Sequence, residues 1–264
     1  MGELFSLSPI SQSLLAGLMT WLLTAVGAAL VVLAKRPHPL LLDAMLAFGA
    51  GVMLASSYWS LLAPAIDLSG ALGQSPLIIV STGFLFGGVL LMLCDTLLSR
   101  CLPASLAATD SRRRSIMLMS SITLHNIPEG LAVGVTFGAL ATAPSTAALG
   151  AAWMLALGIG LQNLPEGAAV SLPLRREGMS RRRAFFFGQA SALVEPLAAV
   201  FGAVLAVYVR SVLPFSLAFA AGAMVCVVIA ELVPESQRHR HSGVMTLFTL
   251  LGFILMMILD VALG

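Results

Sequence analysis

The stretch ALGAAWMLALGIGLQNLPEGAAVSLPL, residues 148–174, carries a single charged side chain, Glu166. A bilayer-spanning helix needs roughly 20 predominantly apolar residues to cross a hydrocarbon core about 30 Å thick. The stretch is long enough, so it predicts a membrane-spanning helix. Glu166 lies about 18 residues into this helix, which at a rise of about 1.5 Å per residue places a carboxylate near mid-membrane.

The rest of the chain repeats this apolar pattern. Its residues are 59% hydrophobic and only 10% charged, and the mean hydropathy is +0.99. These values are typical of a protein embedded in a bilayer rather than of a water-soluble domain. The apolar runs predict eight spanning helices, at about 9–34, 39–64, 76–99, 114–141, 148–174, 184–209, 213–236 and 243–263. We therefore expect an all-α polytopic membrane protein built as a single transmembrane domain, residues 1–264.

Basic residues mark one side of this predicted protein. Every Lys and Arg except Arg210 lies in or beside the loops that follow the first, third, fifth and seventh helices. Loops rich in Lys and Arg face the cytoplasm. The distribution predicts a multi-pass protein of a plasma membrane or bacterial inner membrane, with both termini outside.

A short motif occurs twice, on the fourth and fifth predicted helices. The first copy is HNIPEG at residues 125–130, and the second is QNLPEG at residues 162–167. Neighbouring helices joined by a short loop run antiparallel, so the two copies point in opposite directions, as in an inverted-topology repeat. Each copy places its first residue and its Glu at i, i+4, on one helix face. Glu195 of the sixth helix lies at a similar depth.

The three acids of this region require compensation. A lone ionised carboxylate at mid-membrane costs at least about 2.5 kcal/mol, and no Lys or Arg lies at that depth beside Glu129, Glu166 and Glu195. An imidazole nitrogen with carboxylate and amide oxygens suits Zn²⁺, Fe²⁺ or Mn²⁺ better than Ca²⁺ or Mg²⁺. The absence of thiolates favours release of the ion. The pattern therefore predicts a site that passes divalent transition-metal ions across a membrane.

Two other functions are compatible with buried carboxylates. An intramembrane zinc-dependent hydrolase would normally need two or three histidines and an open coordination position for water, but only His125 lies within a predicted span. A proton-coupled transporter of organic solutes would use the glutamates as proton carriers alone. Hydrolytic turnover abolished by a chelator would indicate the hydrolase, and metal uptake that depends on His125 distinguishes a metal transporter from the solute transporter.

With these motifs the whole chain resembles the ZIP family of metal-ion transporters, the zinc- and iron-regulated-transporter-like proteins, and within it the bacterial branch with HNxPEG and QNxPEG. Glu195-Pro196 and Glu231-x-x-Pro234-Glu235 also match. The resemblance implies a transporter, not an enzyme, without a catalytic cofactor. Zn²⁺, with Fe²⁺, Mn²⁺ and Cd²⁺ as further candidates, is expected to enter the cytoplasm by alternating access. The implied fold has helices in a 3+2+3 arrangement with inverted outer repeats, and a transport bundle that moves by an elevator-like or rocking motion.

The resemblance also implies a binuclear metal site at mid-membrane. One ion is expected on His125, Glu129, Gln162 and Glu166, and the other on Asn126, Asn163 and Glu195, with Glu129 and Glu166 bridging. An entrance is expected at Ser60 and Asp67; Glu231, Glu235, His239 and His241 form an exit pathway or mark a solvated helix end. The expected partners are divalent metal ions, the lipid bilayer and a second copy of the chain as a homodimer, with no nucleic acid.

Overall fold

The structure is a computed structural model of the chain. It describes residues 7–33, 39–101, 110–142, 144–176, 178–237 and 242–263. Throughout these ranges the regular secondary structure is helical and includes no β-strand. The prediction of an all-α protein is confirmed.

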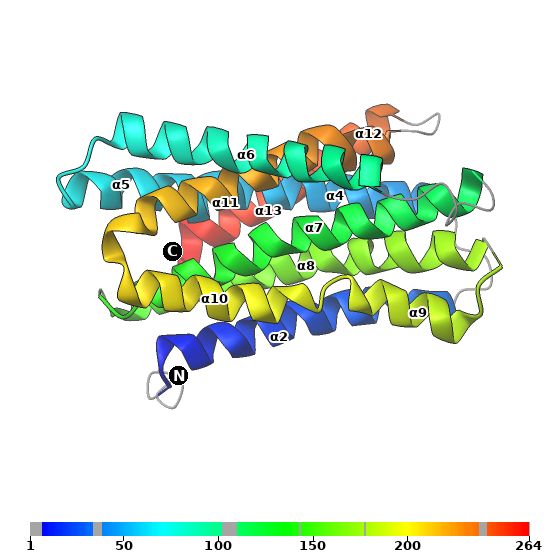
Figure 1. The fold of residues 1–264 in the computed structure, drawn as a ribbon, viewed down its shortest axis with the longest axis horizontal. Coiled ribbons are helices and arrows are strands. Elements are labelled where there is room, and N and C mark those ends of the chain that lie inside the picture. The colour runs from blue at the N-terminus through cyan, green and yellow to red at the C-terminus, as the bar shows by residue number, and fades with distance from the viewer. Residues whose placement is uncertain are drawn as a thin grey trace.

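The helices form long rods that run along the molecule (Figure 1). Some rods are single helices, and others consist of shorter segments joined end to end. In chain order they are α2 (Pro9–Ala28) with α3 (Leu30–Leu33), α4 (Pro39–Ser56) with η1 (Ser57–Leu62) and α5 (Ala63–Ala71), α6 (Pro76–Cys101), α7 (Asp110–Ala139), α8 (Thr146–Arg176), α9 (Arg181–Ala190) with α10 (Val194–Tyr208), the short η3 (Arg210–Val212), α11 (Leu213–Val227) with η4 (Val228–Leu232) and α12 (Val233–Ser236), and α13 (Ser242–Leu263).

Within the described residues, seven rods are long and apolar enough to cross a membrane. The chain is therefore a polytopic membrane protein. Helix α7 is not among the seven. Its central turns carry Ser120, Asn126 and Glu129, so its composition is that of a helix that lines a polar site rather than one that faces lipid. An eighth span at α7 stays a prediction.

The rods pack in two groups (Figure 1). Helices α2, α7, α8 and α10 form the first group, and α4, α6, α11 and α13 form the second. Glycines bring helix backbones into contact within each group: Gly134 of α7 meets Ala199 of α10, and Gly51 of α4 meets Thr249 of α13. Small residues permit such close approach of membrane helices. The predicted metal ligands all belong to the first group.

The two ends of the helical chain lie at one end of the bundle. Helix α2 begins and α13 finishes at the left of Figure 1. At the opposite end of the bundle, α6 and α8 finish and α9 begins. The described basic side chains there are exposed. They are Arg100, Arg175, Arg181, Arg182 and Arg183. These five arginines and the chain ends are therefore separated by the length of the bundle.

Two rods contain a π-helical segment just before a proline. The N–H of Ala63, just after η1, donates to the carbonyl of Tyr58, five residues back. The N–H of Val233, just after η4, donates in the same way to the carbonyl of Val228. Because proline lacks an N–H, a wider π turn lets a helix continue past it. The second rod accordingly extends to Ala71, whereas the predicted helix stops at 64.

The sixth rod is interrupted, unlike the predicted single helix over 184–209. Helix α9 ends at Ala190, and α10 begins only at Val194. Glu195 consequently lies in the first turn of α10 rather than in the middle of a helix. The proline that follows Glu195 cannot donate a helical hydrogen bond, which favours an interruption at this point.

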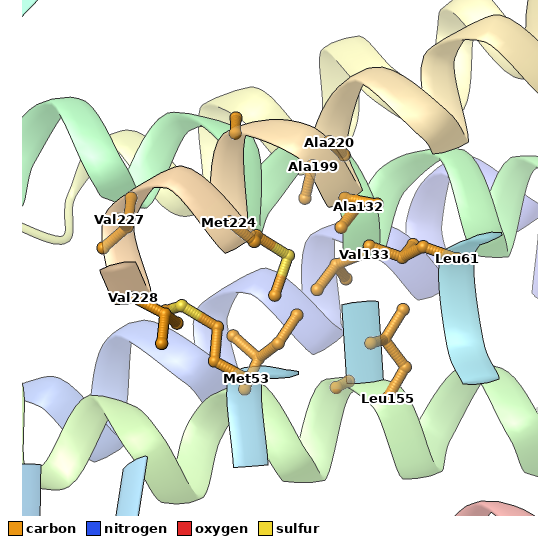
Figure 2. Close-up of a cluster of buried hydrophobic side chains, with 14 of the residues drawn as sticks. Met53, Leu61, Ala132, Val133, Leu155, Ala199, Ala220, Met224, Val227 and Val228 are labelled. Carbon is orange, nitrogen blue, oxygen red and sulfur yellow. The ribbon is translucent and has the colours of Figure 1, made fainter. Parts of the chain in front are cut away.

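A buried apolar cluster fills the space between the two groups (Figure 2). Met53 of α4, Leu61 of η1 and Met224 of α11 meet side chains from the first group, among them Val133 of α7 and Leu155 of α8. Each of these five side chains is at most 1% exposed. At this level the two groups meet through packing of apolar side chains.

Candidate metal site

The predicted metal ligands that the structure describes are buried, with exposed fractions of 4% or less. They are Asn126 and Glu129 of α7, Gln162, Asn163 and Glu166 of α8, and Glu195 of α10. The side chain of His125 lies outside the described part of the chain, so its place in the site stays a prediction. Polar groups this deeply buried require partners.

The two copies of the repeated motif are in direct contact. Gln162 Nε2 donates a hydrogen bond of 2.7 Å to Glu129 Oε1. Three further oxygens, Gln162 Oε1, Glu129 Oε2 and Glu166 Oε2, accept no hydrogen bond from the described residues. Leaving a buried acceptor without a partner costs about 1–3 kcal/mol. Three such oxygens on two facing helices are suited to a cation.

The second set of predicted ligands is internally hydrogen-bonded. Asn163 Nδ2 donates to both carboxyl oxygens of Glu195, at 2.9 and 2.8 Å. Thr20 and Thr24 of α2 lie near this carboxyl group, and their hydroxyl groups donate to the carbonyls of Gly17 and Thr20 within their own helix. Asn163 Oδ1 and Asn126 Oδ1 accept no hydrogen bond within the described ranges. The amide oxygens, rather than the Glu195 carboxylate, are the groups that lack a partner here.

Three carboxyl groups share this buried region. Glu129 lies within electrostatic range of both Glu166 and Glu195. Among the described side chains, no Lys or Arg interacts with any of the three. Neighbouring carboxylates in a low-dielectric region repel each other unless protons or a cation compensate them. The arrangement therefore favours a bound divalent cation.

Acids alone do not complete a metal site. Across the described residues there is no group of three or more His, Cys, Asp or Glu side chains close enough together to hold a metal ion. The amides of Asn126, Gln162 and Asn163, together with the imidazole of His125, would supply the remaining ligands. Amide and carboxylate oxygens with one imidazole suit a borderline divalent ion.

The predicted exit residues are described only in part. Glu231 lies half-buried in η4 and within electrostatic range of Glu166. Glu235 is exposed in α12, while His239 and His241 lie outside the described residues. Of the predicted exit residues that the structure describes, Glu231 is the one that lies near a buried carboxylate of the site.

The predicted entrance residues do not share one environment. Ser60 Oγ donates a hydrogen bond of 2.7 Å to Asp260 Oδ1 of α13, whereas Asp67 is exposed in α5. Asp260 was not predicted as a functional residue, although an acid inside the last apolar run was a signal for it. Thr20 and Thr24 were also missed, and their i, i+4 spacing in the first apolar run was the available signal.

Comparison with known proteins identifies the family. The family model described as ZIP zinc transporter matches residues 105–260. Zinc transporter ZIP11 of Bos taurus is 40% identical to the chain, covering 97% of it and 98% of the relative. Zinc transporter GufA of Myxococcus xanthus is 38% identical over 78% of the chain and 81% of the relative, and zinc transporter ZIPB of Bordetella bronchiseptica is 36% identical over 97% and 82%.

Members of the matched family are transporters rather than enzymes, which argues against the intramembrane hydrolase. The buried acceptor set on the facing copies of the motif agrees with a family whose substrate is a metal ion. The matched family model and the similarity to ZIP11 over nearly the whole chain lead to the same family assignment. The chain belongs to the ZIP family of zinc transporters.

Proposed function

We propose that this protein transports Zn²⁺ across a membrane through the site between α7, α8 and α10. Relatives that the chain matches over most of its length are named zinc transporters. The observation that carries the proposal is the set of buried oxygens on α7 and α8 that accept no hydrogen bond from the described residues. Two of these oxygens belong to Glu129 and Glu166, and no described Lys or Arg side chain compensates the charge of these acids. Zn²⁺ is the substrate, and transport requires no catalytic cofactor.

The proposed ligands form two adjacent positions. His125, Glu129, Gln162 and Glu166 hold the first ion, and Asn126, Asn163 and Glu195 hold the second, with Glu129 and Glu166 bridging. The first position is supported by its three acceptors without partners. At the second, Asn163 would turn its Oδ1 toward the ion in exchange for its bonds to Glu195. Such mixed oxygen and nitrogen ligation also accommodates Fe²⁺, Mn²⁺ and Cd²⁺.

The proposed membrane layout has eight spans, α7 included, in a 3+2+3 arrangement within one transmembrane domain, residues 1–264. The π segments support inverted outer repeats. Each precedes a proline, Pro64 in the second rod and Pro234 in the seventh. These two rods finish at opposite ends of the bundle, α5 at the left and α12 at the right of Figure 1. A π segment followed by a proline therefore occurs in two rods that run in opposite directions, as in an inverted repeat.

The proposed orientation places both termini outside, in a plasma membrane or bacterial inner membrane. It rests on the exposed arginines at the end of the bundle away from α2's start and α13's finish, because basic residues favour the cytoplasmic side. Val133 follows Glu129 by one turn toward the C-terminal end of α7, so part of the apolar cluster lies on that side of the site. The inward direction of transport is proposed from the family resemblance.

The proposed path continues the site in both directions. Ser60, bonded to Asp260, and Asp67 would receive the ion outside. Glu231 would receive it from Glu166, since the two acids interact, and Glu235, His239 and His241 would pass it on. The homodimer stays a prediction: small residues such as Gly51 could pack against a second copy, but here they contact helices of the same chain.

Zinc uptake into proteoliposomes tests the proposal. Native protein should show saturable uptake above a protein-free control. Gln162→Ala and Glu166→Ala should abolish it, because each removes an oxygen of the acceptor set. Gln12→Ala provides a matched control: Gln12 is also a buried amide, but it lies in the first turn of α2 and donates to Leu7. Equal uptake in all four proteins would refute the proposed site, and no uptake by native protein would refute the function.

A further inference from the structure

The break between α9 and α10 lies inside a predicted membrane span, Arg181–Tyr208. Its backbone is tightened into i→i−3 hydrogen bonds. Leu193 donates to the carbonyl of Ala190 at 3.2 Å, and Glu195 donates to that of Ala192 at 3.0 Å. In a regular helix Leu193 and Glu195 would instead donate four residues back. The carbonyl of Ser191 therefore loses its backbone donor, and that of Gln189 keeps only a long hydrogen bond of 3.4 Å from the N–H of Ala192.

Two side chains from neighbouring helices bind these two carbonyls. Asn126 Nδ2 of α7 donates to the carbonyl of Ser191 at 2.9 Å. The indole Nε1 of Trp21 on α2 donates to the carbonyl of Gln189 at 3.1 Å, and it lies at the same distance from Gln189 Oε1. A carbonyl inside a membrane span requires such a partner. The break is therefore held from two sides by side chains of the first group.

The position of Glu195 depends on this break. Glu195 is the second residue of α10, and its side chain is fully buried. The direction in which α10 leaves the break therefore determines where the Glu195 carboxyl group lies relative to Asn163. Asn126 already belongs to the proposed ligand set, whereas Trp21 does not. Trp21 is the contact that acts on the break from outside the site.

We infer that Trp21 is a positioning residue for zinc transport, whose indole N–H fixes the break before α10 and so places Glu195 against α8. The inference rests on the proposed zinc site. It assigns Trp21 no contact with the ion. A Trp21 that only packed α2 against α9 would contribute to stability but would leave the zinc dependence of uptake unchanged.

Trp21→Phe is the direct test, because it keeps an aromatic ring and removes the donor. Losing one hydrogen bond that positions a ligand should raise the zinc concentration for half-maximal uptake about 2-fold to 10-fold, with the maximal rate nearly unchanged. Gln189→Ala is the matched control: it removes the side-chain acceptor but leaves the main-chain carbonyl at the break. Native half-saturation is expected in Gln189→Ala.

A double-mutant cycle separates positioning from packing. If Trp21 acts through Glu195, adding Trp21→Phe to Glu195→Gln should cause no further loss, because the positioned group is already altered. An additive loss would overturn the inference. So would native half-saturation in Trp21→Phe, or a loss in Gln189→Ala as large as in Trp21→Phe.

A spectroscopic measurement keeps the inference testable if Trp21→Phe does not fold. The chain has three tryptophans, so Trp59→Phe with Trp153→Phe leaves Trp21 as the single indole. Zinc should shift its emission, and Glu195→Gln should abolish that shift; an unchanged emission in the first protein would overturn the inference. Failure of the proposed function would give a different result, because Glu166→Ala would then show the same zinc uptake as native protein.

Discussion

A methyl group added at Gly130 tests whether the contact between α7 and α10 sets the geometry of the zinc site. Gly130 directly follows Glu129. A Cβ at this position would lie 2.5 Å from the carbonyl oxygen of Glu195 and 2.8 Å from Ala198 Cβ. Ordinary van der Waals contact begins at 3.4 Å, so α10 would have to move by about 0.9 Å. Neither neighbour can rotate away, because the first is a backbone atom and the second is fixed to one.

The expected consequence is larger for zinc binding than for folding. Overpacking between helices costs about 1–3 kcal/mol of folding free energy. Metal–ligand distances tolerate deviations of about 0.2 Å, so the required displacement moves Glu195 out of register with Glu129. Perturbing the surroundings of metal ligands typically weakens binding about 10-fold to 100-fold. We expect Gly130→Ala to raise the zinc concentration for half-maximal uptake by that factor.

Proteoliposome uptake, with thermal unfolding of the same protein in detergent, measures both effects. Gly70→Ala is the control, because it makes the same change within α5, where no heavy atom lies within 4 Å of the added Cβ. It should retain native uptake. If Gly130→Ala unfolded at a lower temperature but took up zinc with native half-saturation, the contact would matter for folding alone, and the reasoning about the site would be refuted.

Three further results are expected. Acidification should lower zinc binding and uptake, because protons compete with the ion for Glu129 and Glu166; a flat profile between about pH 7 and pH 5.5 would count against direct ligation by carboxylates. Zinc at about 100 times its Kd should add about 2.7 kcal/mol to the free energy of unfolding, and a chelator should reverse the rise in Tm, which Glu166→Ala should lack altogether. Ser60→Ala removes the donor to Asp260, so it should cost about 1 kcal/mol of stability and slow uptake at low zinc. Ser69→Ala is the control and should not slow uptake. Ser69 is a buried serine of the same rod, and its hydroxyl has no partner among the described residues.

The repeated motif was sufficient to predict which side chains are buried together. The i, i+4 spacing within each copy and the short connection between α7 and α8 bring Glu129 and Gln162 into contact, as the observed hydrogen bond requires. The direction of the amides was not predictable. An Asn or Gln side chain offers both a donor and an acceptor, and whether Asn163 presents its nitrogen to Glu195 depends on α10, which is distant in sequence.

The two prolines Pro64 and Pro196 illustrate the limit of local sequence. Each removes a helical donor inside a long apolar run. At η1 the helix widens into a π turn and continues past Pro64, whereas before α10 the chain tightens and breaks. The difference lies in tertiary partners: Trp21 and Asn126 bind the carbonyls of Gln189 and Ser191 at the break. Those partners come from α2 and α7, so Pro196 favours an interruption, but the local sequence does not specify its geometry.

The location of the ligands within one group of helices constrains the elevator-like or rocking movement that the family resemblance implies. Glu129, Gln162 and Glu195 all lie on α7, α8 and α10, whose backbones meet at glycines such as Gly134. Backbone contacts of this kind resist sliding, whereas the apolar cluster between the two groups consists of side chains that can change rotamer (Figure 2). A movement between the groups would therefore carry the site as a unit. Glu231 belongs to the second group, so the same movement would alter its separation from the site, and release can be controlled without dismantling the ligand set.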